Sequence, residues 1–263
     1  MQNIYLELTE KFNSGALRAI LTSGQAVVLH KLAVMSKDGD WIIKEDPSCL
    51  QHVLEILQSY GARYRLGAPL HLDWLGAGWS SHFEFFHQGM RVRTDFFARP
   101  PRISPRNLAA LWQTQANAKI AFTDAKTLAE VKMTMREKDY PIIGELARKM
   151  DSPSDQLLFS RSAQDLIELA KENPLLISEL SSRRPLLSLL GRSTVEKLEA
   201  ALDKERREFM REDAARLEKY ARASATWLAE WPRILGQICA LPLLEAHQVV
   251  VREAHKLLPL VAT

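Results

Sequence analysis

Three aspartates are spaced so that their carboxylates could act together. Asp38 and Asp40 are separated by one residue, and on an extended backbone both side chains point to the same face. Asp95 follows in a later run whose apolar residues alternate as in a strand. Because neighbouring carboxylates repel each other, and Mg²⁺ prefers a few carboxylates with phosphate oxygens and water, the pattern predicts a magnesium site. Two ions there could stabilise the attacking and leaving oxygens of a phosphoryl displacement.

A short turn precedes the aspartate pair. The apolar segment Leu17–Leu21 leads into Thr22-Ser23-Gly24, and helix-forming residues follow at Gln25–Val34. Glycine allows the backbone to come close to a ligand, and the amides that open a helix can hold an anionic phosphate. We therefore expect a strand, a turn and a helix, with Ser23 and Gly24 binding phosphate.

The elements that would position these residues follow from apolar spacing. Helical spacing occurs at Ile4–Phe12 and at His52–Tyr60, the latter after a typical helix start at Asp46-Pro47-Ser48. A strand is favoured at Asp40–Lys44, which contains Trp-Ile-Ile. Alternation indicates further strands at residues 64–66, 70–74, 82–87 and 90–97, the last two joined by a hairpin turn. We predict a mixed sheet with flanking helices.

Strand signals almost disappear after Pro105. Helical patterns occupy residues 107–115, 124–136, 140–150, 162–172, 175–181, 194–220, 221–231 and 244–258. The expected fold class is α+β, with a mixed-sheet domain at residues 1–105 and an all-helical half at residues 106–263. A further boundary is expected near residues 151–155, where Asp151-Ser152-Pro153-Ser154 is typical of a linker.

Taken together, Ser23-Gly24, Asp38-Gly39-Asp40 and Asp95 resemble the nucleotidyltransferase superfamily, in its small bacterial branches related to abortive-infection and toxin–antitoxin nucleotidyltransferases. The resemblance covers roughly residues 17–100. It implies a Mg²⁺-dependent transfer of a nucleoside monophosphate from an NTP such as ATP, with release of pyrophosphate. Asp38, Asp40 and Asp95 would be the catalytic metal ligands. The acceptor hydroxyl could belong to an RNA end, a protein or a small molecule.

A weaker part of the resemblance lies beyond the sheet. Related proteins often have a helix with the spacing of Lys132 and Arg136, which implies contact with the nucleotide phosphates. These two residues are four apart and share one face of a helix. Asp139 lies three residues after Arg136, so an ion pair within the helix is the alternative interpretation.

Two residues depart from the family pattern and keep a second hypothesis open. Ser23 stands where the family usually has its first glycine, and Gly39 stands between the acids where a hydrophobic residue is common. The alternative is a catalytically weak binding or regulatory module with a partner protein, in a toxin–antitoxin or defence pair. A metal-dependent nuclease is a third hypothesis, although the Ser-Gly turn would then have no purpose.

Basic and mixed polar residues around Asp95 have two interpretations. Five arginines fall within sixteen residues, and they form either a solvated edge or an electropositive rim for triphosphate or RNA: Arg91, Arg93, Arg99, Arg102 and Arg106. His82 and Glu84 share one face of their strand. They could line the site, but a half-buried surface pair is the simpler interpretation.

Composition sets the remaining limits. The chain of 263 residues has a formal net charge of +3, which is too small to indicate a nucleic-acid binder by itself. Its two cysteines are far apart, which argues against a disulfide framework or a zinc site. We find no signal-peptide pattern and no apolar run of the roughly 20 residues that span a bilayer. We expect a cytoplasmic protein with no membrane partner.

Overall fold

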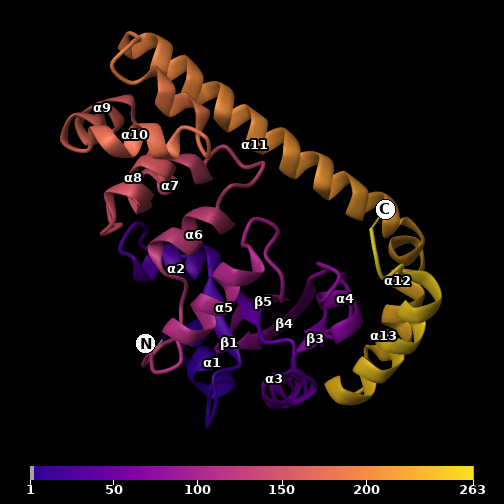
Figure 1. Cartoon of the computed structure of the whole chain (residues 1–263). Coiled ribbons are helices and arrows are strands. Elements are labelled where there is room, and N and C mark those ends of the chain that lie inside the picture. The colour runs from indigo at the N-terminus through magenta and orange to yellow at the C-terminus, as the bar shows by residue number, and fades with distance from the viewer. Residues whose placement is uncertain (1–2, 263) are drawn as a thin grey trace. The chain divides into compact units, whose positions relative to one another are not determined.

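The computed structural model describes residues 3–262, which divide into two compact units (Figure 1). The sheet unit comprises residues up to Thr123 together with Leu217 onward, and the helical unit comprises Asp124–Arg216. This division differs from the expected boundary after residue 105. The reason is packing, because Trp227, Ile234 and Val250 belong to the same hydrophobic core as the N-terminal helices and the sheet.

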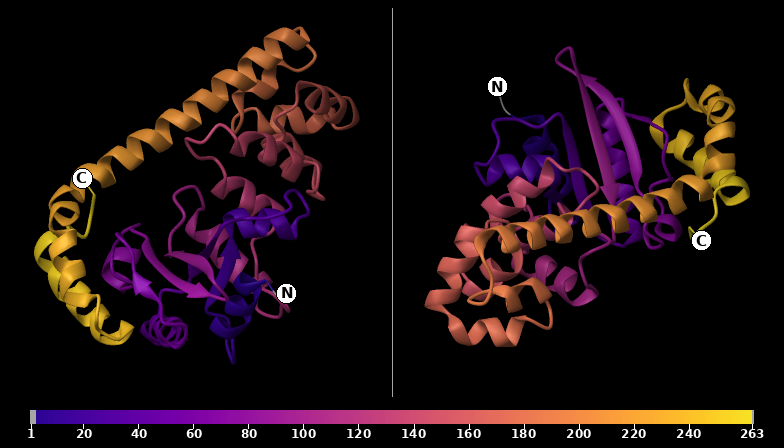
Figure 2. Two further views of the ribbon diagram at one scale, coloured as in Figure 1. Left: turned by 180° about the vertical axis from the view of Figure 1, so that it is seen from behind. Right: turned by 90° about the horizontal axis from the view of Figure 1, so that it is seen from above.

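The sheet unit contains five strands in the order β1-β2-β5-β4-β3. Neighbouring strands are antiparallel except β2 and β5, which are parallel, so the predicted mixed sheet is confirmed. The strands are β1 (Ala19–Thr22), β2 (Asp38–Ile43), β3 (Arg63–Tyr64), β4 (Ser81–His87) and β5 (Met90–Phe97). The predicted hairpin is present, and β4 and β5 are seen side by side in the second view of Figure 2.

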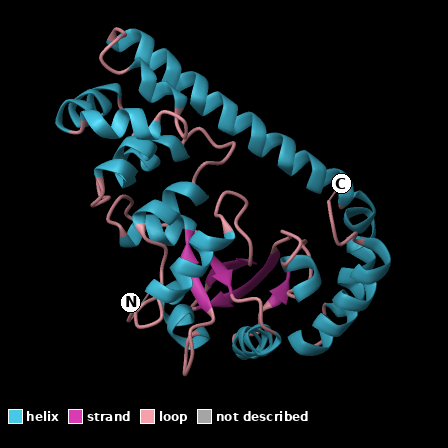
Figure 3. Ribbon diagram, in the orientation of Figure 1, coloured by secondary structure: helices cyan, strands magenta, loops and turns pink. Residues whose placement is uncertain are grey.

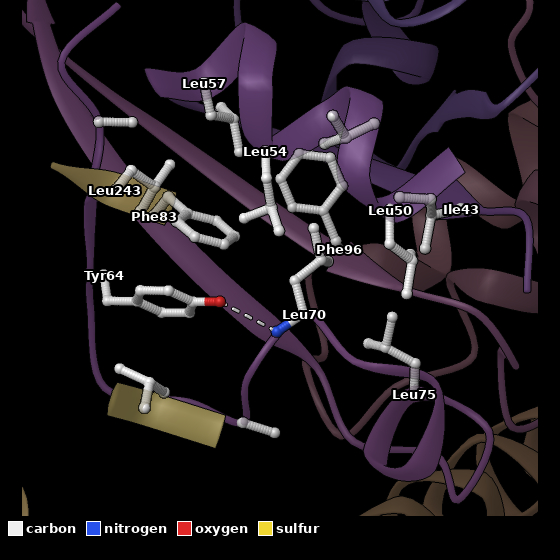
Figure 4. Close-up of a cluster of buried hydrophobic side chains, with 14 of the residues drawn as sticks. Ile43, Leu50, Leu54, Leu57, Tyr64, Leu70, Leu75, Phe83, Phe96 and Leu243 are labelled. Carbon is white, nitrogen blue, oxygen red and sulfur yellow. Dashed lines mark hydrogen bonds between the residues drawn. The ribbon is translucent and has the colours of Figure 1, made fainter. Parts of the chain in front are cut away.

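One face of this sheet is the core of the unit. Trp41 stacks on Phe96 with ring centroids 5.3 Å apart, and Phe12 meets Trp41 edge-on at 5.4 Å. Helices α1 (Ile4–Phe12) and α3 (Pro47–Ser59) cover this face with apolar side chains such as Leu54 (Figure 4). Burial of these large side chains fixes which face of each strand is left for polar residues.

A buried polar pair joins the C-terminal helices to the sheet. Helices α12 (Ala225–Ile238) and α13 (Leu243–Leu257) belong to the sheet unit, and His247 Nδ1 lies 2.7 Å from the Tyr64 hydroxyl. The Leu70 amide donates to the same hydroxyl at 3.1 Å (Figure 4). Burial, followed by the charge of His71, lowers the pKa of His247 to about 4. The neutral imidazole accepts a hydrogen bond from the Tyr64 hydroxyl, so both polar groups are hydrogen-bonded without carrying charge.

Two segments of the sheet unit differ from the expected secondary structure. The alternation predicted at residues 70–74 is wrong, because α4 (Leu72–Leu75) is a short helix capped by the His71 side chain. After α5 (Pro105–Thr114), the segment around Phe122 runs beside β1 as a parallel bridge. The Leu21 amide donates to Ala121 and the Thr123 amide donates to Leu21, both at 2.9 Å. This added edge extends the unit beyond residue 105.

The helical unit contains no strand among residues 124–216 (Figure 3). Its elements are α6 (Ala125–Val131), α7 (Asp139–Ala147), α8 (Pro153–Phe159), α9 (Ala163–Glu172), α10 (Pro174–Leu180), a 3₁₀ turn (Pro185–Leu189) and the first part of α11 (Val195–Ala223). The expected linker at residues 151–155 lies inside this unit, because α8 begins at Pro153 and its Leu157 is fully buried. None of the described helices is long and apolar enough to cross a membrane.

Candidate functional site

The polar face of the sheet carries the three predicted acids. Along β2 and β5 fully buried residues alternate with half-buried ones, and Asp38, Asp40 and Asp95 occupy the half-buried positions. Asp40 is the register partner of Asp95, and Asp38 is the register partner of Arg93. Neighbouring strands lie about 4.8 Å apart, so side chains on the same face at paired positions are close neighbours. The structure therefore brings the three aspartates to one face, with Asp40 and Asp95 side by side.

The predicted turn lies next to these acids. Strands β1 and β2 are antiparallel, which places Thr22 opposite Asp40, and α2 (Ser23–Leu29) begins at the following residue. Ser23 has a φ of 50°, in the left-handed region that favours glycine. Ser23 therefore holds a strained backbone conformation.

Gly24 and Gln25 tie the turn to the start of β2. A Cβ on Gly24 would lie 2.2 Å from Ser36 Oγ, so no side chain fits without a shift. The Gln25 side-chain amide donates to the backbone oxygens of Ser36 and Asp38 at 3.1 and 3.2 Å. These contacts fix the position of the turn relative to the first aspartate.

Side-chain packing explains the glycine between the two acids. Gly39 is on the buried face of β2, and a Cβ there would lie 2.4 Å from both the Trp41 indole and the Tyr5 ring. The Trp41 ring, whose Nε1 donates to Thr9 Oγ1 at 2.9 Å, thus fills the space that a hydrophobic side chain would take. The second departure from the family pattern is therefore compensated within the core.

Asp95 is held by side chains from β4 and the segment after β3. His82 is its register partner on β4, and His82 Nδ1 lies 2.7 Å from Asp95 Oδ1, while Arg65 Nη1 lies 3.4 Å from the same oxygen. A carboxylate only accepts, so Nδ1 donates to Asp95, and the other ring nitrogen, Nε2, lies 3.1 Å from Ser80 Oγ. Sequence reasoning had grouped His82 with Glu84 and did not link it to Asp95, since only the register reveals the contact.

Asp38 is less well satisfied. Its Oδ1 is buried and has no hydrogen-bond partner, and Arg93 Nη1 lies 3.7 Å from it. A buried oxygen without a hydrogen bond carries a desolvation cost, which is reduced here because the Asp38 side chain as a whole is 43% exposed. An incoming cation or hydrogen-bond donor at this oxygen would remove that cost.

The donor set fits Mg²⁺ in its chemistry but not as a preformed cluster. Within residues 3–262, no group of three or more His, Cys, Asp or Glu side chains is arranged to hold a metal ion. Mg²⁺ commonly keeps several waters and uses one or two protein carboxylates with substrate phosphates. The unsatisfied oxygen of Asp38 and the neighbouring positions of Asp40 and Asp95 fit an ion that arrives with a nucleotide.

A cavity of about 600 Å³ borders Asp38. Its lining includes Tyr5 from α1, Gln25 from α2 and Arg93 from β5. The Tyr5 hydroxyl donates to the Lys37 carbonyl at 2.6 Å, and burial, followed by the charge of Asp38, raises the pKa of Tyr5. The Tyr5 hydroxyl and the Gln25 amide already donate to backbone oxygens, so the cavity offers a ligand mainly the Arg93 cation and the unsatisfied carboxylate. Its volume suits a small-molecule ligand.

Lys132 and Arg136 belong to the helical unit, and both contact Asp139. Lys132 Nζ lies 3.0 Å from Asp139 Oδ1, and Arg136 Nε lies 3.0 Å from Oδ2. Thr134 Oγ1 donates to Asp139 at 2.9 Å. These contacts match the ion-pair alternative, although α6 ends before Lys132, so the pairing closes a turn between α6 and α7. Their contact with nucleotide phosphates stays a prediction.

The arginine group separates into residues near the acids and residues elsewhere. Arg91 and Arg93 lie on β5 and border the cavity beside Asp38. Arg99 makes two hydrogen bonds of 2.7 Å to Glu45, and Arg106 is exposed on α5. Only part of the expected electropositive rim is therefore assembled next to the acids.

Comparison with known proteins adds a single structural likeness. No family model matches the sequence, and no curated protein matches it. A solved structure from H. pylori, provisionally described as a nucleotidyltransferase, aligns over 81% of this chain and 94% of its own chain. The alignment has a TM-score of 0.40 and 12% sequence identity. At that level of similarity, function has to be argued from the site itself.

Proposed function

We propose that this protein is a Mg²⁺-dependent nucleotidyltransferase that moves a nucleoside monophosphate from an NTP to an acceptor hydroxyl. The observation that carries the proposal is the register of β2 and β5, which sets Asp40 beside Asp95 on the face that also holds Asp38. The Ser23-Gly24 turn lies at the adjoining end of β1. Acids on two strands beside a turn that opens a helix suit metal-assisted phosphoryl transfer.

In this proposal the side chains position the reactants and balance charge. Ser23 and Gly24 hold the β and γ phosphates. Asp38, Asp40 and Asp95 would hold magnesium, which would supply positive charge for the phosphates. Asp95, oriented by His82, accepts the hydrogen bond of the acceptor hydroxyl. As the acceptor oxygen forms a bond to the α phosphorus, its proton passes to the Asp95 carboxylate, the bond to the bridging oxygen breaks, and pyrophosphate leaves.

The test replaces the paired acids one at a time. Asp40→Asn and Asp95→Asn should each lower Mg²⁺-dependent pyrophosphate release by at least about 100-fold, because each removes a negative ligand at the reacting centre. Asp73→Asn is the matched control, since Asp73 is an exposed carboxylate of the same unit on α4. Equal pyrophosphate release from the wild type, both site variants and the control would reject the proposal.

A second function is favoured by the basic side chains around the acids. Arg65 and His82 contact Asp95, and Arg93 faces Asp38, as in a site that binds a ligand without catalysing a reaction. The alternative is a regulatory module that binds a partner protein, as in a toxin–antitoxin or defence pair. Calorimetry separates the two functions: NTP binding that requires Mg²⁺ supports the transferase, and no heat at millimolar NTP supports the module.

A further inference from the structure

A second cavity in the sheet unit shares a wall with the cavity beside Asp38. It has a volume of about 450 Å³ and lies between the polar face of β3–β5 and helices α12 and α13. Arg91 and Arg93 line both cavities, so the two are separated only by the start of β5. Asp38 lines the first cavity and none of the three acids lines the second, so a ligand in the second cavity would be linked to the acids through Arg65 and Arg93.

Four arginines give the second cavity its charge. They come from the edge strand β3, the residue after it and the central strand β5, and they share the lining with one acidic residue, Glu84: Arg63, Arg65, Arg91 and Arg93. The nearest approaches to Glu84 Oε2 are loose, at 3.9 Å from Arg65 Nε and 3.8 Å from Arg91 Nε. Arginine is the side chain best suited to phosphate, because its planar guanidinium donates two parallel hydrogen bonds. The cavity is thus shaped electrostatically for a ligand with several negative charges.

The opposite wall of this cavity is apolar. Trp231 and Leu235 of α12 contribute to it, and Leu235 is 40% exposed. Proteins that bind single-stranded nucleic acid combine a basic groove along the backbone with apolar or aromatic surfaces against the bases. A carboxylate-rich peptide would satisfy the arginines but would leave this wall without an apolar partner.

The arginines also connect the cavity to the acids. Arg65 contacts Asp95 at 3.4 Å, and Arg93 faces Asp38 at 3.7 Å. When phosphates bind these arginines, the carboxylates lose their resting partners and become available to other cations. Binding in the second cavity would in this way couple to the state of the acidic site.

We propose that this arginine groove binds a single-stranded nucleic acid, so that its terminal hydroxyl is the acceptor. The groove is defined by Arg63, Arg65, Arg91 and Arg93 on one side and by Trp231 and Leu235 on the other. The choice of acceptor rests on the proposed function, whereas strand binding does not. Binding is therefore measured in the absence of NTP and Mg²⁺.

The experiment follows the anisotropy of a short fluorescein-labelled oligouridylate with the full chain over a range of KCl concentrations. For a single strand, the logarithm of the association constant falls with the logarithm of salt by about 0.7 for each phosphate contact. The variant Arg63→Gln/Arg91→Gln removes two exposed arginines that are not part of the proposed catalytic set. We expect about a tenfold loss of affinity at low salt and a salt slope reduced by about 1.4.

Two further variants keep the result interpretable. Arg106→Gln removes the charge of an exposed arginine on α5, outside the groove, and should leave the salt slope unchanged. Leu235→Glu places a negative charge on the apolar wall without changing an arginine, and should weaken strand binding by a similar factor. Circular dichroism of each variant checks that the fold is retained.

Several results would overturn the inference. The first is equal strand affinity in the double variant and in Arg106→Gln. The second is displacement of the strand by polyglutamate as readily as by unlabelled RNA. A loss of free-nucleotide binding instead of strand binding in the double variant would assign the groove to a mononucleotide. Strand binding with the expected slope but without pyrophosphate release on adding NTP and Mg²⁺ would keep the inference about binding and reject the proposed reaction.

Discussion

Asp139 in the helical unit and Asp38 in the sheet unit differ in burial and in how completely their carboxylates are paired, since the Asp38 side chain is 43% exposed. Asp139 is 2% exposed and has Lys132, Thr134 and Arg136 within 3.0 Å. Asp38 has one buried oxygen with no hydrogen bond and a cation only at 3.7 Å. A fully paired carboxylate stabilises its own surroundings, whereas an incompletely paired one keeps coordination capacity for a ligand. Asp95 lies between these cases, since His82 and Arg65 occupy one of its oxygens.

The largest effect on stability is expected at the fully paired acid. Asp139→Asn leaves Lys132 buried without its counter-charge, so we expect the free energy of unfolding to fall by about 3–5 kcal/mol. Urea denaturation of the full chain measures this change. Glu145→Gln is the control, because Glu145 is 51% exposed in its ion pair with Arg148 and should matter by less than about 1 kcal/mol. Similar small losses in both variants would remove the contrast between the two kinds of acid.

A buried neutral pair in the sheet unit provides a pH-dependent comparison. Burial lowers the pKa of His247 to about 4 from an ordinary 6.5, so the unfolded chain binds the proton first. Its contribution to stability is complete above pH 6.5 and is lost as pH falls toward 4, by about 3 kcal/mol in total. Urea denaturation across this range should show a steeper decline for the wild type than for His247→Asn. Parallel pH dependences of the free energy of unfolding in the two proteins would contradict the lowered pKa of His247.

Asp95, of which one oxygen is already hydrogen-bonded, should depend on His82 for its position during the reaction. His82→Ala removes the donor to Asp95 Oδ1, and we expect kcat to fall about tenfold while the free energy of unfolding changes little. His82→Asn keeps a donor near the position of Nδ1 and should restore most of the loss. Steady-state pyrophosphate release at saturating NTP measures kcat in each variant. A tenfold loss that Asn does not restore would show that the ring itself, rather than its Nδ1 donor, is needed.

The smallest effect is expected at the strained turn. Ser23→Gly removes the Cβ from a left-handed residue and should raise the free energy of unfolding by up to about 1 kcal/mol, reduced in part by the greater flexibility of glycine when unfolded. Ser23→Ala keeps the strain but loses the hydroxyl, so it should raise KM for NTP and leave stability unchanged. Thermal unfolding and NTP kinetics separate these two contributions. A stabilising Ala together with a neutral Gly would contradict the strain at this turn.

Much of the local structure could be predicted from sequence, because it depends on residues close together in the chain. The period of two placed Asp38 and Asp40 on one face, and the Ser23-Gly24 turn followed from glycine and the apolar segment before it. The neighbouring positions of Asp40 and Asp95 could not be derived, because β2 and β5 are parallel strands whose register depends on everything between them. The contact of His82 with Asp95 depends on the same register.

The division into units failed to follow from sequence for a similar reason. An apolar stripe on a helix shows that one side is buried, but it does not show against what. Trp227 and Val250 pack in the sheet unit although their helices end the chain. The need for glycine at position 39 could not be predicted from sequence either. Two rings exclude a side chain there, one from Trp41 on the same strand and one from Tyr5 on α1.

The central claim is that the acids of the polar face take up magnesium together with a nucleotide. Isothermal titration with a non-hydrolysable NTP tests it directly, in the wild type and in Asp38→Asn, with Mg²⁺ or with EDTA. We expect binding by the wild type that needs Mg²⁺ and is weakened at least about tenfold in the variant, since Asp38 carries the unsatisfied oxygen. Equal affinity with Mg²⁺ and with EDTA, or equal affinity in Asp38→Asn, would contradict the account.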